Sequence, residues 1–348
     1  MPDFTPLASA LPALGLSAWV TQRLCNPASR FHLLDQPNER SLHTRPTPRS
    51  GGLGVLTGWV AGSAVVGFTL GGLPILLWLC AALLPLAVVS FMDDYAGVSA
   101  VLRFVVHTGC AVLLVWGAGL VLDRDLMPGL SQLRYKSVGE PLALLYIIWM
   151  VNLYNFMDGM DGLAGGMAVV GFGTFAVLGF MAGHGLFLAA SLVAASAAGG
   201  FLLFNFPPAR IFMGDVGSSS LGLLAAALTL WAARDGIFPF WLGLLVFSPF
   251  IVDATITLVR RLLRGERVWQ AHKTHYYQRL VHLGWGHKKT VLWEYALMLA
   301  CGLSAIWAVR RSALLQWMTI VFWLACYIAL ALSVHRLERR ARMLLRHG

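Results

Sequence analysis

Long apolar stretches run through the whole sequence, and short polar stretches separate them. Taken as helices, the apolar stretches give about eleven segments, at residues 4–24, 52–70, 72–92, 102–121, 140–156, 163–182, 185–204, 217–233, 237–259, 290–309 and 313–335. Most are about twenty residues long, the length of α-helix that crosses a hydrocarbon core of roughly 30 Å. The pattern predicts an all-α, polytopic membrane protein with one integral-membrane domain at 1–348 and a basic cytoplasmic tail at 336–348.

The composition indicates a membrane environment, and the distribution of charge predicts the orientation of the chain in the membrane. Hydrophobic residues make up 58% of the chain and charged residues 12%, well below the quarter that is usual in soluble domains. Most of the 26 lysines and arginines fall on one side if the N-terminus lies outside. Basic residues favour the cytoplasmic side, so we expect an outer N-terminus, a cytoplasmic C-terminus and a place in the bacterial inner membrane. The net charge of +10 would then face anionic headgroups or a polyphosphate substrate.

The polar stretches all fall on the predicted cytoplasmic side. FMDDYAG contains Asp93 and Asp94, NLYNFMDGMDG contains Asn155, Asp158 and Asp161, and FNFPPARIFMGDVGSSSLG contains Asn205, Arg210 and Asp215. Two further loops, NERSLHTRPTPRSGG and RRLLRGERVWQAHKTHYYQRLVHLGWGHKK, lie on the same side. Isolated carboxylates near hydrocarbon are costly unless they are paired or bind a metal. We therefore expect these segments to converge on one functional face.

The acidic residues have a spacing that suits a hard divalent cation. Asn155, Asp158 and Asp161 are three residues apart and would share one face of a helical turn. Carboxylates together with water and phosphate oxygens are the ligands that Mg²⁺ or Mn²⁺ prefers. Asp215 precedes a glycine and three serines at the start of a predicted helix, where free N–H groups favour a phosphate. A serine N-cap beside a solvated aspartate is the alternative for that stretch.

The loop AHKTHYYQRL adds imidazole and cationic groups. His272 and His275 are three residues apart, with Lys273 and Arg279 nearby, and phosphate or headgroup contact is the favoured role. Zinc would need further ligands that the pattern lacks. Asp253 and Glu294 lie deeper in apolar runs; Asp253 either pairs with an arginine or lies beside a catalytic group.

In combination, these stretches resemble the polyprenyl-phosphate N-acetylhexosamine-1-phosphate transferases, the MraY/WecA-type superfamily. The order DD, NxxDGxDGLAGG, FNxxPARIFMGDxGS and a histidine loop extends over most of the chain. The resemblance implies transfer of a sugar-1-phosphate from a UDP-sugar to undecaprenyl phosphate with release of UMP. It also implies dependence on Mg²⁺ or Mn²⁺. The partners implied are a UDP-N-acetylhexosamine, undecaprenyl phosphate and the bilayer, with no nucleic acid; a homodimer is left open.

The resemblance also assigns roles to individual residues. It implies that Asp215 binds the metal, with Asp158 as a second ligand, and that Asp93, Asp94, Asp158, Asp161, His272 and His275 form the catalytic centre. It implies that Asn155, Asn205 and Phe212 belong to the nucleotide pocket, with Arg210, Lys273 and Arg279 as further substrate contacts. Arg45 and Arg49 are candidates for basic contacts.

Two departures select a branch of the superfamily. The peptidoglycan branch, phospho-N-acetylmuramoyl-pentapeptide transferase, has a lysine soon after its aspartate pair and three consecutive histidines, whereas this chain has DDYAGVSA and HKTH. The chain looks more like the O-antigen and surface-glycan branch, which uses UDP-GlcNAc or a deoxy relative such as UDP-FucNAc for lipopolysaccharide or cell-wall glycans. The pentapeptide transferase remains an alternative. An ion-coupled transporter is the alternative from another class, but transporters place their acidic residues near the membrane midplane.

Overall fold

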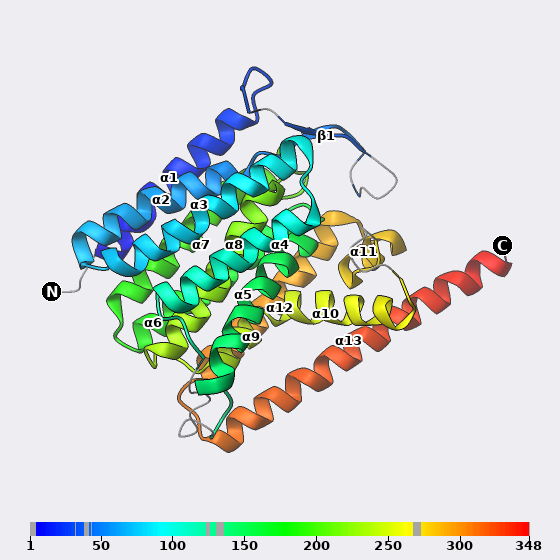
Figure 1. The fold of residues 1–348 in the computed structure, drawn as a ribbon. Helices are drawn as coiled ribbons and strands as arrows, with labels where there is room; N and C mark the ends of the chain where they lie inside the picture. Colours follow the sequence, from blue (N-terminus) through cyan, green and yellow to red (C-terminus); the bar gives the residue numbers. More distant parts are fainter. Residues whose placement is uncertain are drawn as a thin grey trace.

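The computed structural model describes residues 5–31, 33–37, 42, 44–122, 126–129, 136–266 and 273–347, and within them the chain is almost entirely helical (Figure 1). The first half contains α1 (Thr5–Leu24), β1 (Leu34–Asp35), β2 (Thr47–Pro48), α2 (Gly52–Leu70), α3 (Leu73–Ala96), α4 (Ala100–Val112), η1 (Leu113–Gly117) and α5 (Lys136–Met157). The second half contains α6 (Leu163–Met181), α7 (Gly185–Asn205), α8 (Gly214–Arg234), α9 (Phe240–Val246), α10 (Ser248–Leu263), α11 (Tyr276–Leu280), η2 (Val281–Trp285), α12 (Gly286–Ala308) and α13 (Ala313–His347).

All but one of the predicted apolar segments fold as a continuous helical stretch. The exception is 237–259, which is broken at Phe247 into α9 and α10, two helices bent by 80°. Pro249 lies at the start of α10 and cannot supply the backbone N–H that would continue α9. Within the described residues, eight helices are long and apolar enough to cross a membrane, or nine if the bent pair counts as one span. The chain is therefore a polytopic membrane protein, and its orientation stays a prediction.

Helix α8 forms the centre of the helical bundle. Every residue from Val216 to Ala233 is buried, and α8 packs against α2, α3, α5, α6, α7 and α9. Leucine and alanine on all sides of α8 produce this result, because a helix that is apolar all round is stable only when it is surrounded. The Asp215 end of α8 is thereby held fixed relative to several other helices.

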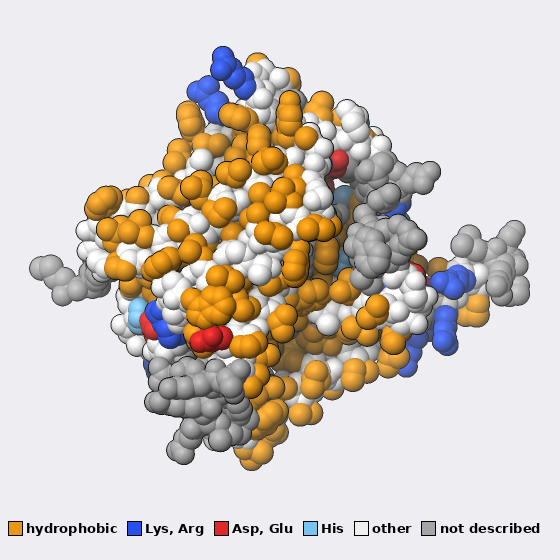
Figure 2. Space-filling view, in the orientation of Figure 1, with side chains coloured by type: hydrophobic (Ala, Val, Ile, Leu, Met, Phe, Trp, Pro, Cys, Tyr) orange, Lys and Arg blue, Asp and Glu red, His pale blue; other side chains and the backbone are white. Residues whose placement is uncertain are grey.

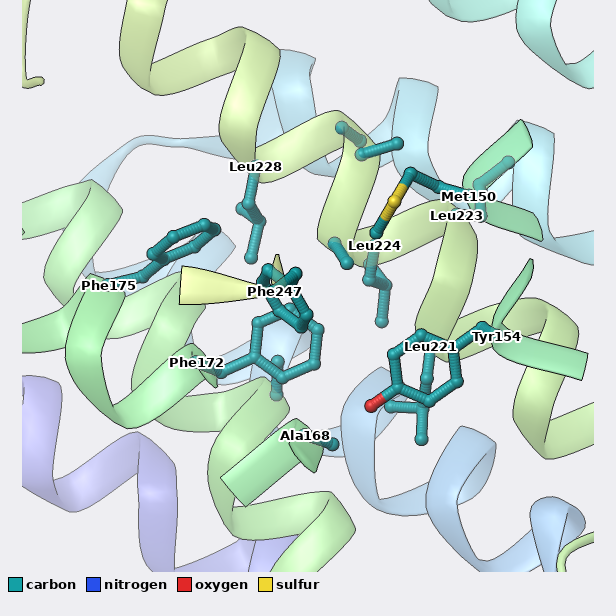
Figure 3. Close-up of a cluster of buried hydrophobic side chains, with 14 of the residues drawn as sticks. Met150, Tyr154, Ala168, Phe172, Phe175, Leu221, Leu223, Leu224, Leu228 and Phe247 are labelled. Carbon is teal, nitrogen blue, oxygen red and sulfur yellow. The ribbon is translucent and has the colours of Figure 1, made fainter. Parts of the chain in front are cut away.

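A cluster of aromatic side chains anchors the bend between α9 and α10. Phe247 is fully buried, and its ring centroid lies 5.7 Å from that of Phe172 and 5.5 Å from that of Phe175. Figure 3 shows Phe247 between these rings of α6, Tyr154 of α5 and the leucines of α8. The bend is therefore part of the packed core, and it turns α10 away from α9.

The outside of the bundle is apolar. Figure 2 shows hydrophobic side chains over most of one face and charged side chains gathered at its edges. Helix α13 runs along the periphery (Figure 1), and Leu314, Met318, Val321 and Ile328 are all more than half exposed on it. A surface of this kind is stable in lipid and would be a liability in water.

A short β-ribbon, absent from the predicted all-α fold, precedes α2. Strands β1 and β2 are antiparallel, with Leu34 opposite Pro48 and Asp35 opposite Thr47. The chain after β2 is bound to the segment before α8: the Phe212 N–H donates to Pro48 O at 2.6 Å and the Gly51 N–H donates to Phe212 O at 3.0 Å. These bonds place Arg49 beside the start of α8.

Candidate active site

Helix termini from distant parts of the sequence meet at one end of the bundle. Asp93 and Asp94 lie in the last turn of α3, Asp158 directly follows α5, and Asp215 opens α8. The convergence predicted from the sequence is confirmed for these side chains by the contacts between them, described next.

Asp94 binds the N-terminus of α8 instead of facing open space. Its Oδ2 accepts the Asp215 N–H at 2.9 Å, and it also accepts a hydrogen bond from the Val216 backbone. Gly214 has φ +70°, and a Cβ there would lie 2.8 Å from Asp94 Oδ2 and 2.1 Å from the Arg49 carbonyl oxygen. Two of the N–H groups at this helix start, which were predicted to be free for a phosphate, are therefore bound by a side chain instead. A carboxylate from α3 already occupies the positive end of the helix dipole.

Asp93 lies on the other side of the same turn of α3 and faces Asp215. The Asp215 carboxylate is within hydrogen-bonding reach of the Asp93 carboxylate and the Asn155 amide. Asp93 also pairs with Arg103 of α4, its Oδ2 lying 2.6 Å from Arg103 Nη1, and its Oδ1 accepts the Val98 N–H at 2.7 Å. Two carboxylates this close repel unless a cation or a proton lies between them.

The turn from Asp158 to Gly162 separates its two aspartates. Helix α5 ends at Met157, so Asp158 and Asp161 do not share the helical face predicted for them. Burial, together with the carboxylates of Asp215 and Asp94, raises the pKa of Asp158 to about 8. Asp158 therefore belongs electrostatically to the Asp94–Asp215 group.

Asp161 contacts different partners. Its Oδ2 accepts the Ala209 N–H at 3.0 Å, and its Oδ1 lies 3.2 Å from His287 Nδ1 at the start of α12. Asn205 fixes the same turn: its Oδ1 accepts the Gly162 N–H and its Nδ2 donates to Ile211 O, both at 2.9 Å. Both polar ends of the buried Asn205 side chain are thus bound to backbone, which makes it a link between the turn and the segment before α8.

The remaining basic and aromatic candidates surround this group. Arg49 Nη2 donates to the Asp94 carbonyl, and its Nε lies 3.8 Å from Asp94 Oδ1. Arg45 is exposed, and Arg210 is exposed with its guanidinium 5.5 Å from the Phe204 ring centroid. Phe212 is half-buried in the segment that binds Pro48. Arg49 is thus joined directly to the acidic residues.

The histidine loop is built onto α10. Asp253 Oδ1 lies 3.2 Å from His275 Nδ1 and accepts the Tyr276 N–H at 3.0 Å, so among the residues that the structure describes Asp253 pairs with a histidine and not with an arginine. Arg279, predicted to contact substrate, donates to both carboxylate oxygens of Glu338 on α13, at 2.7 and 2.8 Å. Lys273 is half-buried, and His272 lies outside the described residues.

An apolar cavity of about 410 Å³ opens between α10, α12 and α13. Its lining includes Val252, Ile256, Leu297 and Leu330, with the carboxylates of Asp253 and Glu294 among them. Because Asp253 holds the histidine loop, this cavity borders the loop directly.

The donor set fits a divalent cation of the Mg²⁺ type. Within the described ranges, no three His, Cys, Asp or Glu side chains form a closed metal cage. Mg²⁺ needs none, since one or two carboxylates with water and phosphate oxygens complete its shell. Asp215 and Asp158 are the side chains suited to hold it, because both are half-buried and lie near further negative charge.

Three residues at this end of the bundle were not singled out from the sequence. Arg103 pairs with Asp93, His287 with Asp161, and Tyr277 approaches the Asp158 turn. His287 and Tyr277 stand in the loop quoted for its histidines, but their spacing carries no metal-binding or catalytic pattern. Arg103 lies ten residues after Asp93, a separation that only the close packing of α3 and α4 turns into contact.

Comparisons with known proteins agree with this architecture. Residues 75–233 match the model of glycosyl transferase family 4. The "Probable undecaprenyl-phosphate N-acetylglucosaminyl 1-phosphate transferase" of Bacillus subtilis is 32% identical over 320 residues, covering 88% of this chain and 83% of that protein. The decaprenyl-phosphate N-acetylglucosaminephosphotransferase of Mycobacterium tuberculosis is 31% identical, covering 76% and 73%.

A more distant match is the phospho-N-acetylmuramoyl-pentapeptide-transferase of Staphylococcus aureus. It is 27% identical, covering 75% of this chain and 84% of that protein. The family match at 75–233 includes Asp93, Asp94, Asp158 and Asp215. The chain belongs to the polyprenyl-phosphate N-acetylhexosamine-1-phosphate transferase superfamily.

Proposed function

We propose that this protein transfers N-acetylhexosamine-1-phosphate from a UDP-sugar to undecaprenyl phosphate at the cytoplasmic face of the inner membrane. The donor is UDP-GlcNAc or a deoxy relative such as UDP-FucNAc, and the product starts a lipid-linked surface glycan of the O-antigen type. The observation that carries this proposal is the meeting of Asp93, Asp94 and Asp215 from α3 and α8, joined by the 2.9 Å bond from the Asp215 N–H to Asp94 Oδ2.

The choice of a GlcNAc-type donor rests on the relatives and on the loop sequences. The two relatives named for N-acetylglucosaminyl phosphate transfer are 32% and 31% identical, against 27% for the pentapeptide transferase. The chain also has no lysine in DDYAGVSA and reads HKTH where the pentapeptide branch has three histidines. Transfer of phospho-N-acetylmuramoyl-pentapeptide is the second candidate.

The reaction brings two anions together, and the site is arranged to offset their repulsion. An oxygen of the lipid phosphate attacks the β-phosphorus of the UDP-sugar and forms a P–O bond. The bond from that phosphorus to the bridging oxygen breaks, and UMP leaves with the electron pair. Asp215 and Asp158 would hold a divalent cation, which would supply charge neutralisation for the phosphates.

The protein's own residues position the reactants. Arg103 and Arg49 provide positive charge on either side of the α3 aspartates. Asp93, held by Arg103 and the Val98 N–H, orients the acceptor phosphate, which is already mostly dianionic near neutral pH. Asp94 positions Asp215 by fixing the first turn of α8. Prior orientation of this kind is worth several kcal/mol of the barrier, on the order of 7–11 in well-aligned systems.

The acceptor also needs a path for its apolar chain. The cavity between α10, α12 and α13 has an apolar lining and borders the Asp253–His275 pair. We assign it to the part of the polyprenyl tail nearest the phosphate, because burying isoprene units there removes apolar surface from the polar interface. The remainder of the tail would lie in the bilayer along α10.

The test is an assay of UMP release. Purified protein is incubated with undecaprenyl phosphate, Mg²⁺ and, separately, UDP-GlcNAc, UDP-FucNAc and UDP-N-acetylmuramoyl-pentapeptide. The proposal expects UMP and a lipid-pyrophosphate sugar from the first or second donor. Turnover of the pentapeptide donor alone would establish the second candidate, and no UMP from any donor would refute both.

Two substitutions at opposite ends of α8 test whether UMP release depends on Asp215. Asp215→Asn removes the charge that holds the cation and should abolish UMP release in a folded protein. Asp235→Asn is the matched control at the far end of the helix, where Asp235 binds Trp231 and Arg234, and should leave UMP release at the wild-type rate. Wild-type turnover in Asp215→Asn would remove Asp215 from the site.

A further inference from the structure

The histidine loop brings a buried tyrosine against the acidic turn. Tyr277 of α11 is fully buried, and a Cβ placed on Gly159 would lie only 2.3 Å from the Tyr277 Oη. The hydroxyl therefore lies directly over the backbone between Asp158 and Met160. Glycine at position 159 is what allows this approach.

The Tyr277 hydroxyl has no hydrogen-bond acceptor among the described residues. The buried oxygen lies within reach of the Gln278 side chain, and Asp158, Asp253 and Glu294 are near enough to act on it electrostatically, but it makes no hydrogen bond to any of these three carboxylates. The Oε1 of Gln278 accepts the His275 N–H at 3.2 Å. The Gln278 amide nitrogen can only donate toward Tyr277, so the hydroxyl proton still lacks an acceptor. Buried hydroxyl groups without partners are uncommon and unfavourable.

Hydrogen bonds to Asp253 fix the position of the Tyr277 backbone. The Asp253 carboxylate accepts the Tyr276 N–H at 3.0 Å and the Tyr277 N–H at 3.3 Å. The His275 ring, held by the same carboxylate, stacks on the Tyr277 ring with 5.7 Å between centroids and 15° between planes. The backbone and ring of Tyr277 are thus held rigidly, while its hydroxyl proton is left without an acceptor near Asp158.

From this arrangement we infer that Tyr277 is a substrate-contacting residue: its hydroxyl donates a hydrogen bond to an oxygen of the UDP-sugar bound beside Asp158. This inference rests on the proposed function and adds a named donor contact to it. Asp253 and His275 are then positioning residues, which act on the substrate only through Tyr277. The unbound hydroxyl is a preorganised donor, oriented before the substrate arrives.

Tyr277→Phe tests this directly, because it removes the hydroxyl and keeps the ring. We expect kcat/KM for the UDP-sugar to fall about tenfold to a hundredfold, the effect of one hydrogen bond to a charged group. The KM for undecaprenyl phosphate should not change. The thermal midpoint of the unliganded protein should not fall, since the hydroxyl donates no internal hydrogen bond, and the rise in that midpoint on adding UDP-sugar should shrink.

Tyr146→Phe is the matched control, because its buried hydroxyl donates to Thr229 Oγ1 at 3.3 Å, away from the acidic residues. We expect a lower thermal midpoint and a wild-type kcat/KM. Asp253→Asn should lower kcat/KM in the wild-type background and have little further effect on kcat/KM in Tyr277→Phe.

The outcomes separate the two proposals. Wild-type kcat/KM in Tyr277→Phe, with a full UDP-sugar-induced rise in midpoint, would overturn the role of Tyr277 and leave the transferase proposal standing. A lower unliganded midpoint in Tyr277→Phe, like that of Tyr146→Phe, would show an internal structural bond and also overturn it. Failure of the wild-type protein to release UMP would refute the proposed function, and the inference would fall with it.

Discussion

The close approach of the Tyr277 hydroxyl to Gly159 can be tested by adding one methyl group at position 159 and measuring the change in stability. Gly159→Ala places a Cβ 2.3 Å from the Tyr277 Oη, far inside the separation that real Cβ atoms show. Either the tyrosine or the acidic turn must move. Placing a methyl group against the buried Tyr277 side chain overpacks this contact, which typically costs about 1–3 kcal/mol, so we expect the substitution to destabilise the protein by that amount.

The cost should vanish when the hydroxyl is absent. In a Tyr277→Phe background, the nearest remaining atoms to the new Cβ are Gln278 Nε2 at 3.4 Å and the ring Cζ at 3.5 Å, which are ordinary contacts. Gly159 is not among the glycines with positive φ, so alanine suits its backbone and can even stabilise by about 0.4–1 kcal/mol. The two substitutions should therefore show a coupling of about 1–3 kcal/mol.

The assay is a double-mutant cycle on detergent-solubilised protein. Wild type, Gly159→Ala, Tyr277→Phe and the double variant are heated, and the folded fraction is followed by fluorescence-detected size exclusion. Gly243→Ala serves as a steric control, since its Cβ would meet the Thr229 side chain at 2.3 Å, remote from Tyr277. An equal loss of stability from Gly159→Ala in both backgrounds would refute the reasoning, because it would place the Tyr277 hydroxyl elsewhere.

Three further predictions concern the fold that supports the site. Asn205→Ala leaves two buried backbone groups without partners and should lower the unfolding free energy by about 2–4 kcal/mol, measured by thermal midpoint. Partial burial pushes the pKa of Asp235 up, but hydrogen bonds from Arg234 outweigh it and hold that pKa below its usual value. The stabilisation by Asp235 is therefore present above pH ~4 and lost as the pH falls through the lowered pKa, so the midpoints of wild type and Asp235→Asn should converge in acid. Phe247→Ala should cost about 3–5 kcal/mol, because this ring fills the centre of the aromatic cluster at the bend.

The sequence predicts most of the helices because the membrane imposes a simple length and polarity rule. A twenty-residue apolar run has few stable alternatives in lipid, so α2, α3, α6 and α7 lie where hydropathy places them. Hydropathy also predicted one continuous span at 237–259, and there it was wrong. The bend at Phe247 depends on Pro249 and on aromatic side chains of α5 and α6. The mean hydropathy of the segment 237–259 contains no information about residues of other helices.

The features of the site also separate into those that the sequence predicts and those that only the tertiary structure shows. The sequence determined the order of the acidic motifs and the convergence of the helix ends that carry them. Successive spans cross the membrane in opposite directions, so every second polar segment returns to the same membrane face. Tertiary structure alone decided what each carboxylate does there. Asp94 binds the α8 N-terminus, Asp93 pairs with Arg103, and Asp161 meets His287. These assignments depend on the directions of side chains that meet across helix contacts of a few ångströms. The spacing of residues along the sequence does not encode the distance between side chains on two different helices.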